Sequence, residues 1–285
     1  MKRLVSTLVA LAVTTGVSVH STRAGELMAQ DASQCPAEDP SLEAALHDLR
    51  EYMLKPGAKL DFAAITASPA LQTVRRAEET RRSNDWAFLC KYKRQNDEAR
   101  AQAAPDVVLL GDSITENWLQ ADPSLFSPSV VNRGISGQTS SQMLVRFYAD
   151  VIGLEPKVVH IMAGTNDVAG NTGPIGDDDF KNNIRAMVEL AKSHKISVVI
   201  ASIPPARAFA WRPDLAPAKR IVGLNVWLKQ YAEEQGAVYV DYYSALSDGA
   251  GGLDGALGND GVHPNRDGYA RMKPLAQQAL KNSAR

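Results

Sequence analysis

From Asp106 to the C-terminus, short apolar runs alternate with longer stretches in which apolar residues recur at helical spacing. The runs are largely continuous rather than alternating with polar residues, which is typical of parallel strands covered on both faces. Five such runs are present, at residues 106–110, 129–132, 157–163, 196–203 and 237–243. This alternation predicts a doubly wound fold, a three-layer α/β/α sandwich with a five-stranded parallel sheet.

Two of the intervening stretches carry an apolar stripe of the kind that a helix buries. The first stripe consists of Phe180, Ile184, Met187, Val188 and Ala191. The second consists of Ile221, Leu224, Leu228 and Tyr231. The acidic run 177–179 precedes the first stripe, and we interpret it as a helix cap rather than a metal site. A last helix is predicted over residues 266–281.

Residues 30–103 lack strand-like runs and predict a helical extension ahead of a core domain at residues 104–285. Within 41–55, apolar residues recur at helical spacing until Pro56 and Gly57 end the pattern. Residues 68–102 predict one or two charged helices. Their expected buried positions are Leu71, Val74, Trp86, Leu89 and Tyr92.

The first residues have the organisation of a secretory signal peptide. Lys2 and Arg3 precede a mostly apolar stretch at 4–19, and small residues follow before Ala24 and again before Ala29. We therefore expect a signal peptide at residues 1–24, with cleavage as late as residue 29, and a secreted or periplasmic protein. The alternative, a membrane anchor, needs a longer and purer apolar run.

Composition narrows the set of partners and cofactors. A formal net charge of −1 without long charge blocks argues against a nucleic-acid partner. In an oxidising compartment Cys35 and Cys90 are expected to form a disulfide, although two unrelated thiols remain an alternative. Two cysteines without clustered histidines do not make a zinc site, so no metal is expected.

Chemically active residues follow the predicted strands at the edge where open α/β sheets place their functional groups. Ser113 comes just after the first run, Gly134 after the second and Asn166 after the third. Asp260 and His263 come after the fifth run, beyond a glycine-rich loop.

These residue types fit nucleophilic catalysis. A serine hydroxyl needs a base to take its proton, which His263 can supply while Asp260 orients its ring. Negative charge that develops on a carbonyl oxygen needs fixed hydrogen-bond donors. The backbone amides of Ser113 and Gly134 and the side-chain amide of Asn166 are the expected donors. The chain has no G-x-S-x-G elbow and no G-x-G-x-x-G fingerprint.

The segments "GDSIT", "NRGISGQTS", "GTND" and "DGVHP" resemble, in order, the four sequence blocks of the SGNH hydrolase superfamily, the GDSL-like lipases and acylhydrolases. The resemblance spans residues 104–285 and implies a flavodoxin-like fold that needs no cofactor. It implies Ser113 as nucleophile, Ser113, Gly134 and Asn166 as the oxyanion hole, and Asp260 and His263 as acid and base. Ile114 replaces the leucine of the GDSL name.

The sequence thus predicts a secreted serine esterase that works through an acyl-serine intermediate. Modest loops leave little chain for a deep tunnel, so we expect short acyl groups, such as acetyl esters of saccharides or small alcohols. Two alternatives stay open: an acyltransferase that acts on a sugar hydroxyl, and a catalytically silent carbohydrate-binding domain. Residues 204–217 either line the pocket through Phe209, Trp211 and Arg212 or form a surface loop. The oligomeric state is left open.

Overall fold

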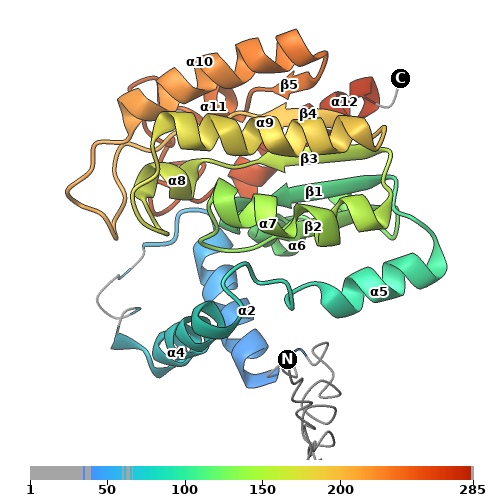
Figure 1. The fold of residues 1–285 in the computed structure, drawn as a ribbon. Helices are drawn as coiled ribbons and strands as arrows, with labels where there is room; N and C mark the ends of the chain where they lie inside the picture. Colours follow the sequence, from blue (N-terminus) through green and yellow to red (C-terminus); the bar gives the residue numbers. More distant parts are fainter. Residues whose placement is uncertain (1–34, 36–39, 60, 62–64, 66, 284–285) are drawn as a thin grey trace, which may run out of the picture. The chain divides into compact units, whose positions relative to one another are not determined.

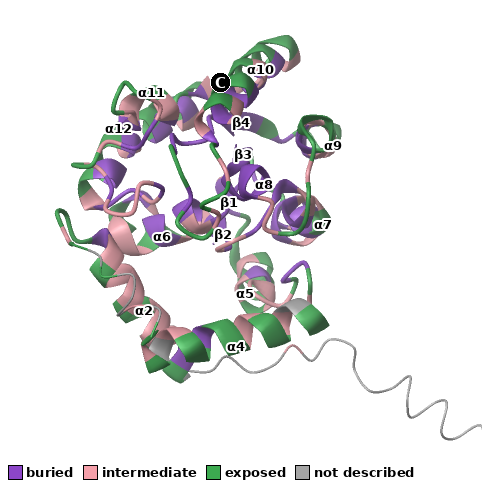
Figure 2. Cartoon of the chain, turned by 90° about the vertical axis from the view of Figure 1, so that its left-hand side faces the viewer, coloured by how far each residue is buried: buried purple, intermediate pink, exposed green. Residues whose placement is uncertain are grey.

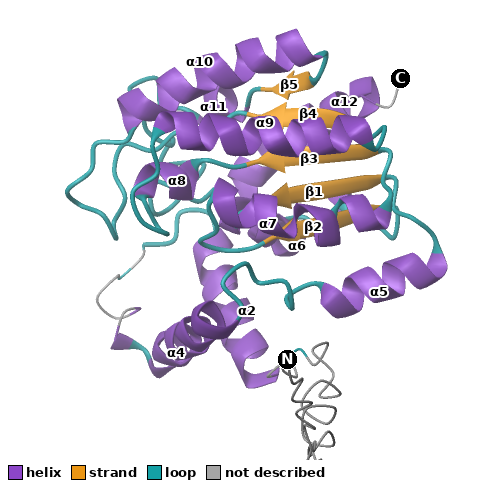
Figure 3. Cartoon of the chain, in the orientation of Figure 1, coloured by secondary structure: helices purple, strands orange, loops and turns teal. Residues whose placement is uncertain are grey.

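Five parallel strands form the central sheet in the order β2-β1-β3-β4-β5 (Figures 1 and 3). They are β1 (Val107–Gly111), β2 (Val130–Gly134), β3 (Val158–Met162), β4 (Ser197–Ala201) and β5 (Val238–Val240). This is a computed structural model that describes residues 35, 40–59, 61, 65 and 67–283. Residues Ala37–Arg285 form one compact unit, which contains the whole sheet. The expected signal peptide lies outside the described residues.

Helices cover both faces of the sheet, which confirms the predicted sandwich. One face is covered by α7 (Ser140–Asp150), α9 (Asp177–Ser193) and α10 (Ala218–Gln235), and the other by α6 (Ser113–Ala121), α11 (Tyr242–Leu246) and α12 (Arg266–Ser283). Figure 2 looks onto the carboxyl ends of the strands, with buried residues between the two helical layers. Short turns of helix are α8 (Thr165–Ala169), η1 (Pro123–Leu125) and η2 (Ile152–Leu154).

Both predicted apolar stripes are buried, on α9 and on α10. The acidic run at the start of α9 caps the helix, as expected: the Asp179 carboxylate accepts a hydrogen bond from the Gly176 N–H at 3.1 Å. Asp177 pairs with Arg220 of α10 at 2.7 Å. None of the helices in the part of the chain that the structure describes is long and apolar enough to cross a membrane.

The helical extension forms α2 (Pro40–Leu54), α4 (Pro69–Asn84) and α5 (Lys93–Gln102). Ser68 caps α4, its hydroxyl oxygen accepting from the Leu71 N–H at 3.2 Å. Helix α2 packs against α4 and α6. It is also tied to the core by Arg50, which pairs with Glu116 of α6 at 2.7 Å.

Two of the expected buried positions are wrong. Trp86 and Leu89 are 46% and 45% exposed, whereas Ala87 and Phe88 between them are buried. The reason is local: α4 ends at Asn84, and the Asp85 carboxylate accepts from the N–H groups of Leu89 and the following cysteine, which holds a turn instead of a helix. Helical spacing therefore does not predict which side chains are buried in the segment after α4.

Candidate active site

The predicted reactive side chains come together at the carboxyl ends of the strands. Ser113 is the first residue of α6, directly after β1. The short β1-to-α6 turn needs a glycine, because a Cβ on Gly111 would lie 2.0 Å from the Thr115 hydroxyl oxygen. Asp112 caps α6, its carboxylate accepting from the Ile114 N–H at 2.9 Å. This turn fixes the serine hydroxyl at the mouth of the sheet.

Ser113, His263 and Asp260 form a continuous chain of hydrogen bonds. Ser113 Oγ lies 2.9 Å from His263 Nε2, and His263 Nδ1 lies 2.6 Å from Asp260 Oδ2. The other Asp260 oxygen accepts from the backbone N–H groups of His263, at 2.7 Å, and Val262, at 2.9 Å. The carboxylate thus fixes both the ring and the backbone of the histidine.

The electrostatics of this chain favour a basic imidazole next to the serine. Burial alone would lower the pKa of His263, but the charge and hydrogen bond of Asp260, together with nearby Asp112, raise it above the ordinary value of 6.5. Burial would raise the pKa of Asp260, yet the charge of His263 and its N–H donors hold that pKa below its usual range. Burial raises the pKa of Asp112 to about 6.

The Asn166 side chain lies at the start of α8 and faces the same cavity as Ser113 and His263. Its Nδ2 donates to the Gln138 carbonyl at 3.1 Å and, more weakly, to Asp112 Oδ2 at 3.3 Å. Its Oδ1 accepts from Asn171 Nδ2 at 2.6 Å. These contacts hold the amide in one orientation, with its donor nitrogen close to the serine turn.

Gly134, the expected backbone donor from the second motif, is wrongly placed for that role. Strand β2 runs two residues further than predicted, so Gly134 is still paired with Gly111 in the sheet. Its N–H donates to Asn132 Oδ1 at 2.8 Å, and its carbonyl accepts from the Tyr92 hydroxyl. It does not line the cavity that contains Ser113.

Gly137, the second glycine of the same motif, does line that cavity. Its φ of +78° is a conformation that favours glycine. Within the part of the chain that the structure describes, its N–H has no hydrogen-bond acceptor. Of the two glycines in this motif, it is thus Gly137 whose N–H is left without an acceptor among the described residues and whose residue lines the cavity.

Glu116, which the sequence did not suggest, anchors the turn that carries Gly137. Its Oε2 accepts from both the N–H of Ser136, at 2.7 Å, and the Ser136 hydroxyl, at 2.6 Å. Its Oε1 pairs with Arg50 at 2.7 Å and with Lys91 at 3.4 Å. Burial would raise the pKa of Glu116, but these two cations and the Ser136 donors lower it to about 2.

The cavity above Ser113 has a volume of about 380 Å³ and is lined partly by the helical extension. The core contributes Ser113, Asn117, Ser136, Gly137, Asn166, Asn171, Trp211 and His263, and the extension contributes residues of α2 and α4. Of the three residues of segment 204–217 that could line the pocket, only Trp211 is among the residues that line this cavity, its Nε1 donating to Asn171 Oδ1 at 3.0 Å. Phe209 is buried and stacks on Trp211, with 5.1 Å between the ring centroids. Arg212 bonds to Asp214 instead.

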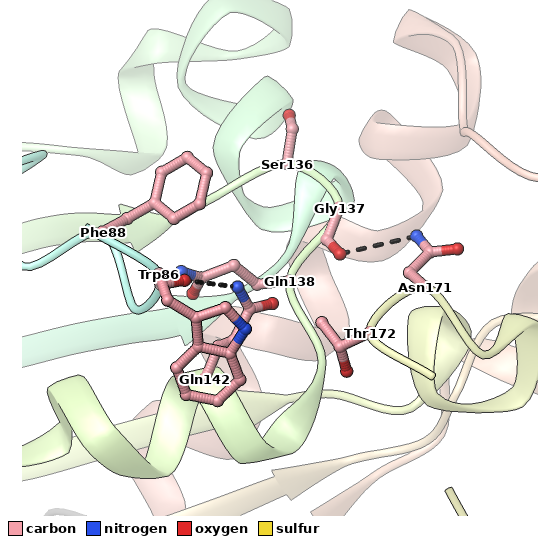
Figure 4. Close-up of a pocket in the computed structure, with 8 residues that line it drawn as sticks. All are labelled: Trp86, Phe88, Ser136, Gly137, Gln138, Gln142, Asn171 and Thr172. Carbon is pink, nitrogen blue, oxygen red and sulfur yellow. Dashed lines mark hydrogen bonds between the residues drawn. The ribbon is translucent and has the colours of Figure 1, made fainter. Parts of the chain in front are cut away.

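A smaller cavity of about 100 Å³ lies behind the Gly137 turn (Figure 4). Gln142 Nε2 donates to the Trp86 carbonyl at 2.7 Å, and Asn171 Nδ2 donates to the Gly137 carbonyl at 3.4 Å. The contact with Asn171 therefore also helps to hold the Gly137 turn. Among the described residues, no group of three or more histidine, cysteine, aspartate or glutamate side chains is arranged to hold a metal ion.

A parallel α/β sandwich that brings serine, histidine and aspartate into hydrogen-bond contact at its strand ends has the architecture of a serine hydrolase. The comparison with protein families makes this specific. The chain belongs to the GDSL-like lipase/acylhydrolase family, whose model matches residues 109–271. It is an enzyme of a family that hydrolyses ester bonds.

Solved structures agree with this assignment. A protein from Bacteroides fragilis assigned as an acylhydrolase is 45% identical, with a TM-score of 0.67; the match covers 70% of this chain and 99% of that one. A GDSL-like lipase from Bacteroides thetaiotaomicron is 40% identical, with a TM-score of 0.65, over the same shares of the two chains.

Three curated relatives are more distant. The lipoprotein YqeF of Bacillus subtilis is 30% identical over 35% of this chain, and the match spans 49% of its own length, about half. Esterase TesA of Pseudomonas aeruginosa is 26% identical over 63% of this chain and 89% of its own. An acetylxylan esterase of Geobacillus stearothermophilus is 30% identical over 49% of this chain and 66% of its own.

Proposed function

We propose that this protein is a serine esterase that hydrolyses carboxylic esters through an acyl-serine intermediate. The observation that carries the proposal is the unbroken contact from Asp260 through His263 to Ser113, which opens into a cavity. Serine alone is a poor nucleophile, and an adjacent base that is itself oriented by a third group activates it.

In the acylation step, Ser113 Oγ attacks the ester carbonyl carbon while its proton passes to His263 Nε2. The bond from Oγ to the carbonyl carbon forms, and the carbonyl oxygen takes up negative charge. When the tetrahedral intermediate collapses, the bond to the alkoxide oxygen breaks, and His263 gives its proton to that oxygen. The alcohol leaves, and the acyl group stays on Ser113.

We assign the oxyanion to three donors: the Ser113 N–H at the start of α6, the Gly137 N–H and the Asn166 side-chain amide. The first N–H groups of a helix have no intrahelical partner, so the Ser113 amide is available to an anion. The Asn166 amide has to exchange its long contact with Asp112 for the oxyanion. This exchange favours the charged transition state over the neutral ester.

In the deacylation step, water attacks the acyl carbon and gives its proton to His263 Nε2. The bond between the acyl carbon and Ser113 Oγ breaks, and His263 returns the proton to Oγ. One ester and one water are consumed, and one acid and one alcohol are released, so no further reactant is needed.

For the substrate we propose esters of short acyl groups, including acetyl esters of saccharides or small alcohols. The acetylxylan esterase relative supports this class. We also propose that the protein is exported, since the first residues have the features of a signal peptide and one relative is a lipoprotein.

The test is pre-steady-state hydrolysis of p-nitrophenyl acetate by the full chain. We expect a burst of p-nitrophenol equal to the enzyme concentration, abolished in Ser113→Ala and retained in the exposed control Ser193→Ala. An added saccharide acceptor followed by product analysis identifies any acyl transfer. A wild-type protein that does not hydrolyse the ester, whether or not it transfers the acetyl group, would refute the proposal.

A further inference from the structure

One part of the cavity lining, which we call the wall, consists of residues outside the matched family region. It comes from the two extension helices α2 and α4, which both lie beside the β2 edge of the sheet (Figures 1 and 2). Its apolar members are Leu46, Leu49, Met53, Leu71 and Val74. The GDSL-type domain therefore does not make its active-site cavity alone.

Two side chains of this wall, those of Leu49 and Met53, are not part of the hydrophobic core. Of the residues that the structure describes on α2, the core between the sheet and α6 and α12 includes Leu54, but neither Leu49 nor Met53. Both of those are half-buried and face the cavity shared with Ser113 and His263. Apolar surface left open next to a nucleophile is suited to hold the apolar part of a substrate.

The wall is fixed to the side of the site where the leaving group departs. Asn259, adjacent to Asp260, donates from its Nδ2 to the Met53 carbonyl at 2.7 Å. Glu51 of α2 pairs with Arg266, at the start of α12, at 2.7 Å. The C-terminal half of α2 is thus tied to both ends of the segment that carries His263.

This placement distinguishes the two halves of an ester. His263 must protonate the leaving alkoxide oxygen, so the alcohol moiety has to lie on the histidine side of Ser113. The acyl group has to extend the other way. That half of the ester is left to the core residues of the cavity lining, among them Asn166, Asn171 and Trp211.

Resting on the proposed esterase function, we infer that Leu49 and Met53 form a subsite for the alcohol moiety. Among the esters proposed above, this subsite favours those of small alcohols with an alkyl or aryl surface over those of saccharides. Each methylene buried against this wall gains about fourfold in affinity for the bound state and the transition state. The helical extension then sets alcohol specificity, while the matched family region supplies the reacting groups.

The experiment measures kcat/KM for acetate esters of a primary alcohol series from methyl to hexyl, with the acyl group held constant. For the wild-type protein we expect kcat/KM to rise with alcohol length. The ratio of the hexyl to the methyl value is expected to fall about fourfold or more in Leu49→Ala and in Met53→Ala. Val226→Ala is the matched control, since Val226 is an apolar side chain on α10 that is 65% exposed and lies outside this cavity.

A second pair of variants, Leu49→Asn and Met53→Gln, keeps roughly the volume of each side chain but makes it polar, and circular dichroism checks that each variant folds. A hexyl-to-methyl ratio that stays at the wild-type value in the folded variants would overturn the subsite. So would a wild-type ratio near one. Neither outcome touches the esterase proposal, which fails only if the wild-type protein lacks the hydrolysis that Ser113→Ala abolishes.

Discussion

Asn166 is the side chain whose role depends most on chemistry rather than packing. Its amide nitrogen makes two hydrogen bonds: one to the Gln138 carbonyl, and a longer one to Asp112, which belongs to the turn that carries Ser113. We predict that Asn166→Ala lowers kcat by about 10² to 10³ and leaves KM nearly unchanged, because the lost bond forms mainly in the transition state. Parallel steady-state kinetics and thermal unfolding check this. A lower melting temperature with normal turnover would mean that Asn166 only holds the turn.

The His263 imidazole must be neutral to accept the Ser113 proton, so activity is expected to fall at acidic pH. Its pKa is raised above 6.5, mainly because the favourable charge and hydrogen bond of Asp260 outweigh burial. Activity is therefore lost as pH falls through a midpoint above 6.5, and Asp260→Asn is expected to move that midpoint downward and lower kcat. The measurement is kcat/KM across pH 5 to 9. An unshifted midpoint in Asp260→Asn would remove Asp260 as the cause.

At this scale the sequence suggested Ser113, His263 and Asp260, which the structure places in hydrogen-bond contact, because each is tied to the end of a recognisable strand or to a short local motif. It pointed to Gly134 instead of Gly137, because it did not show that β2 continues to Gly134 or that the Gly134 N–H donates to Asn132 Oδ1. Gly137 was visible as the next glycine in the motif. Glu116 gave no signal, since its partners Arg50 and Ser136 are distant in sequence.

At the scale of elements, Glu116 joins Arg50 of α2 to the turn that carries Gly137, and removing it is expected to affect both stability and catalysis. Glu116 is only 9% exposed and satisfies Arg50, Lys91 and Ser136 together. We predict that Glu116→Ala lowers the free energy of unfolding by about 3 kcal/mol, since it leaves partly buried cations without their carboxylate. It should also lower kcat more than it changes KM, because Glu116 no longer holds Ser136 and with it the turn that positions the Gly137 N–H.

Denaturant unfolding and steady-state kinetics on the same preparation test both parts. Lys93→Ala is the control, since it breaks an exposed ion pair with Asp97 that contributes at most about 1 kcal/mol. If Glu116→Ala loses stability but keeps its kcat, Glu116 only joins α6 to the extension. If it loses neither, the network does not exist in solution.

The disulfide between Cys35 and Cys90 stays a prediction about how the extension is held. Among the described residues, which include both cysteines, no free cysteine is present. Closing a loop of this length stabilises the folded chain by about 4 kcal/mol at most in the chain-entropy model. Intact mass after alkylation without reductant is expected to show no modified thiol, and reductant is expected to lower the melting temperature. Two alkylated cysteines would contradict the prediction.

The elements themselves were predictable to different degrees. Strands and the helices α9 and α10 followed from continuous and striped apolar patterns that burial on the sheet imposes. The segment after α4 did not, because the Asp85 carboxylate turns the chain and exposes Trp86 and Leu89. Nor could helical spacing reveal that one face of α2 borders a cavity, since the stripe of a lining helix has the same period as that of a packed helix.

At the scale of the whole molecule, the sheet gathers the reacting groups and the extension adds a second wall, so the two halves of an ester meet different surfaces. The core residues that we assign to the acyl group, Asn166, Asn171 and the stacked Trp211, include no aliphatic side chain. A methylene gains affinity only where it is buried in apolar surroundings, by about 0.8 kcal/mol. We therefore predict that kcat/KM for p-nitrophenyl esters, in which the alcohol is constant, falls beyond short acyl chains. Measuring acetate to decanoate decides this, and a maximum at a long acyl chain would place the acyl group against α2 and α4 and reverse the orientation of the substrate.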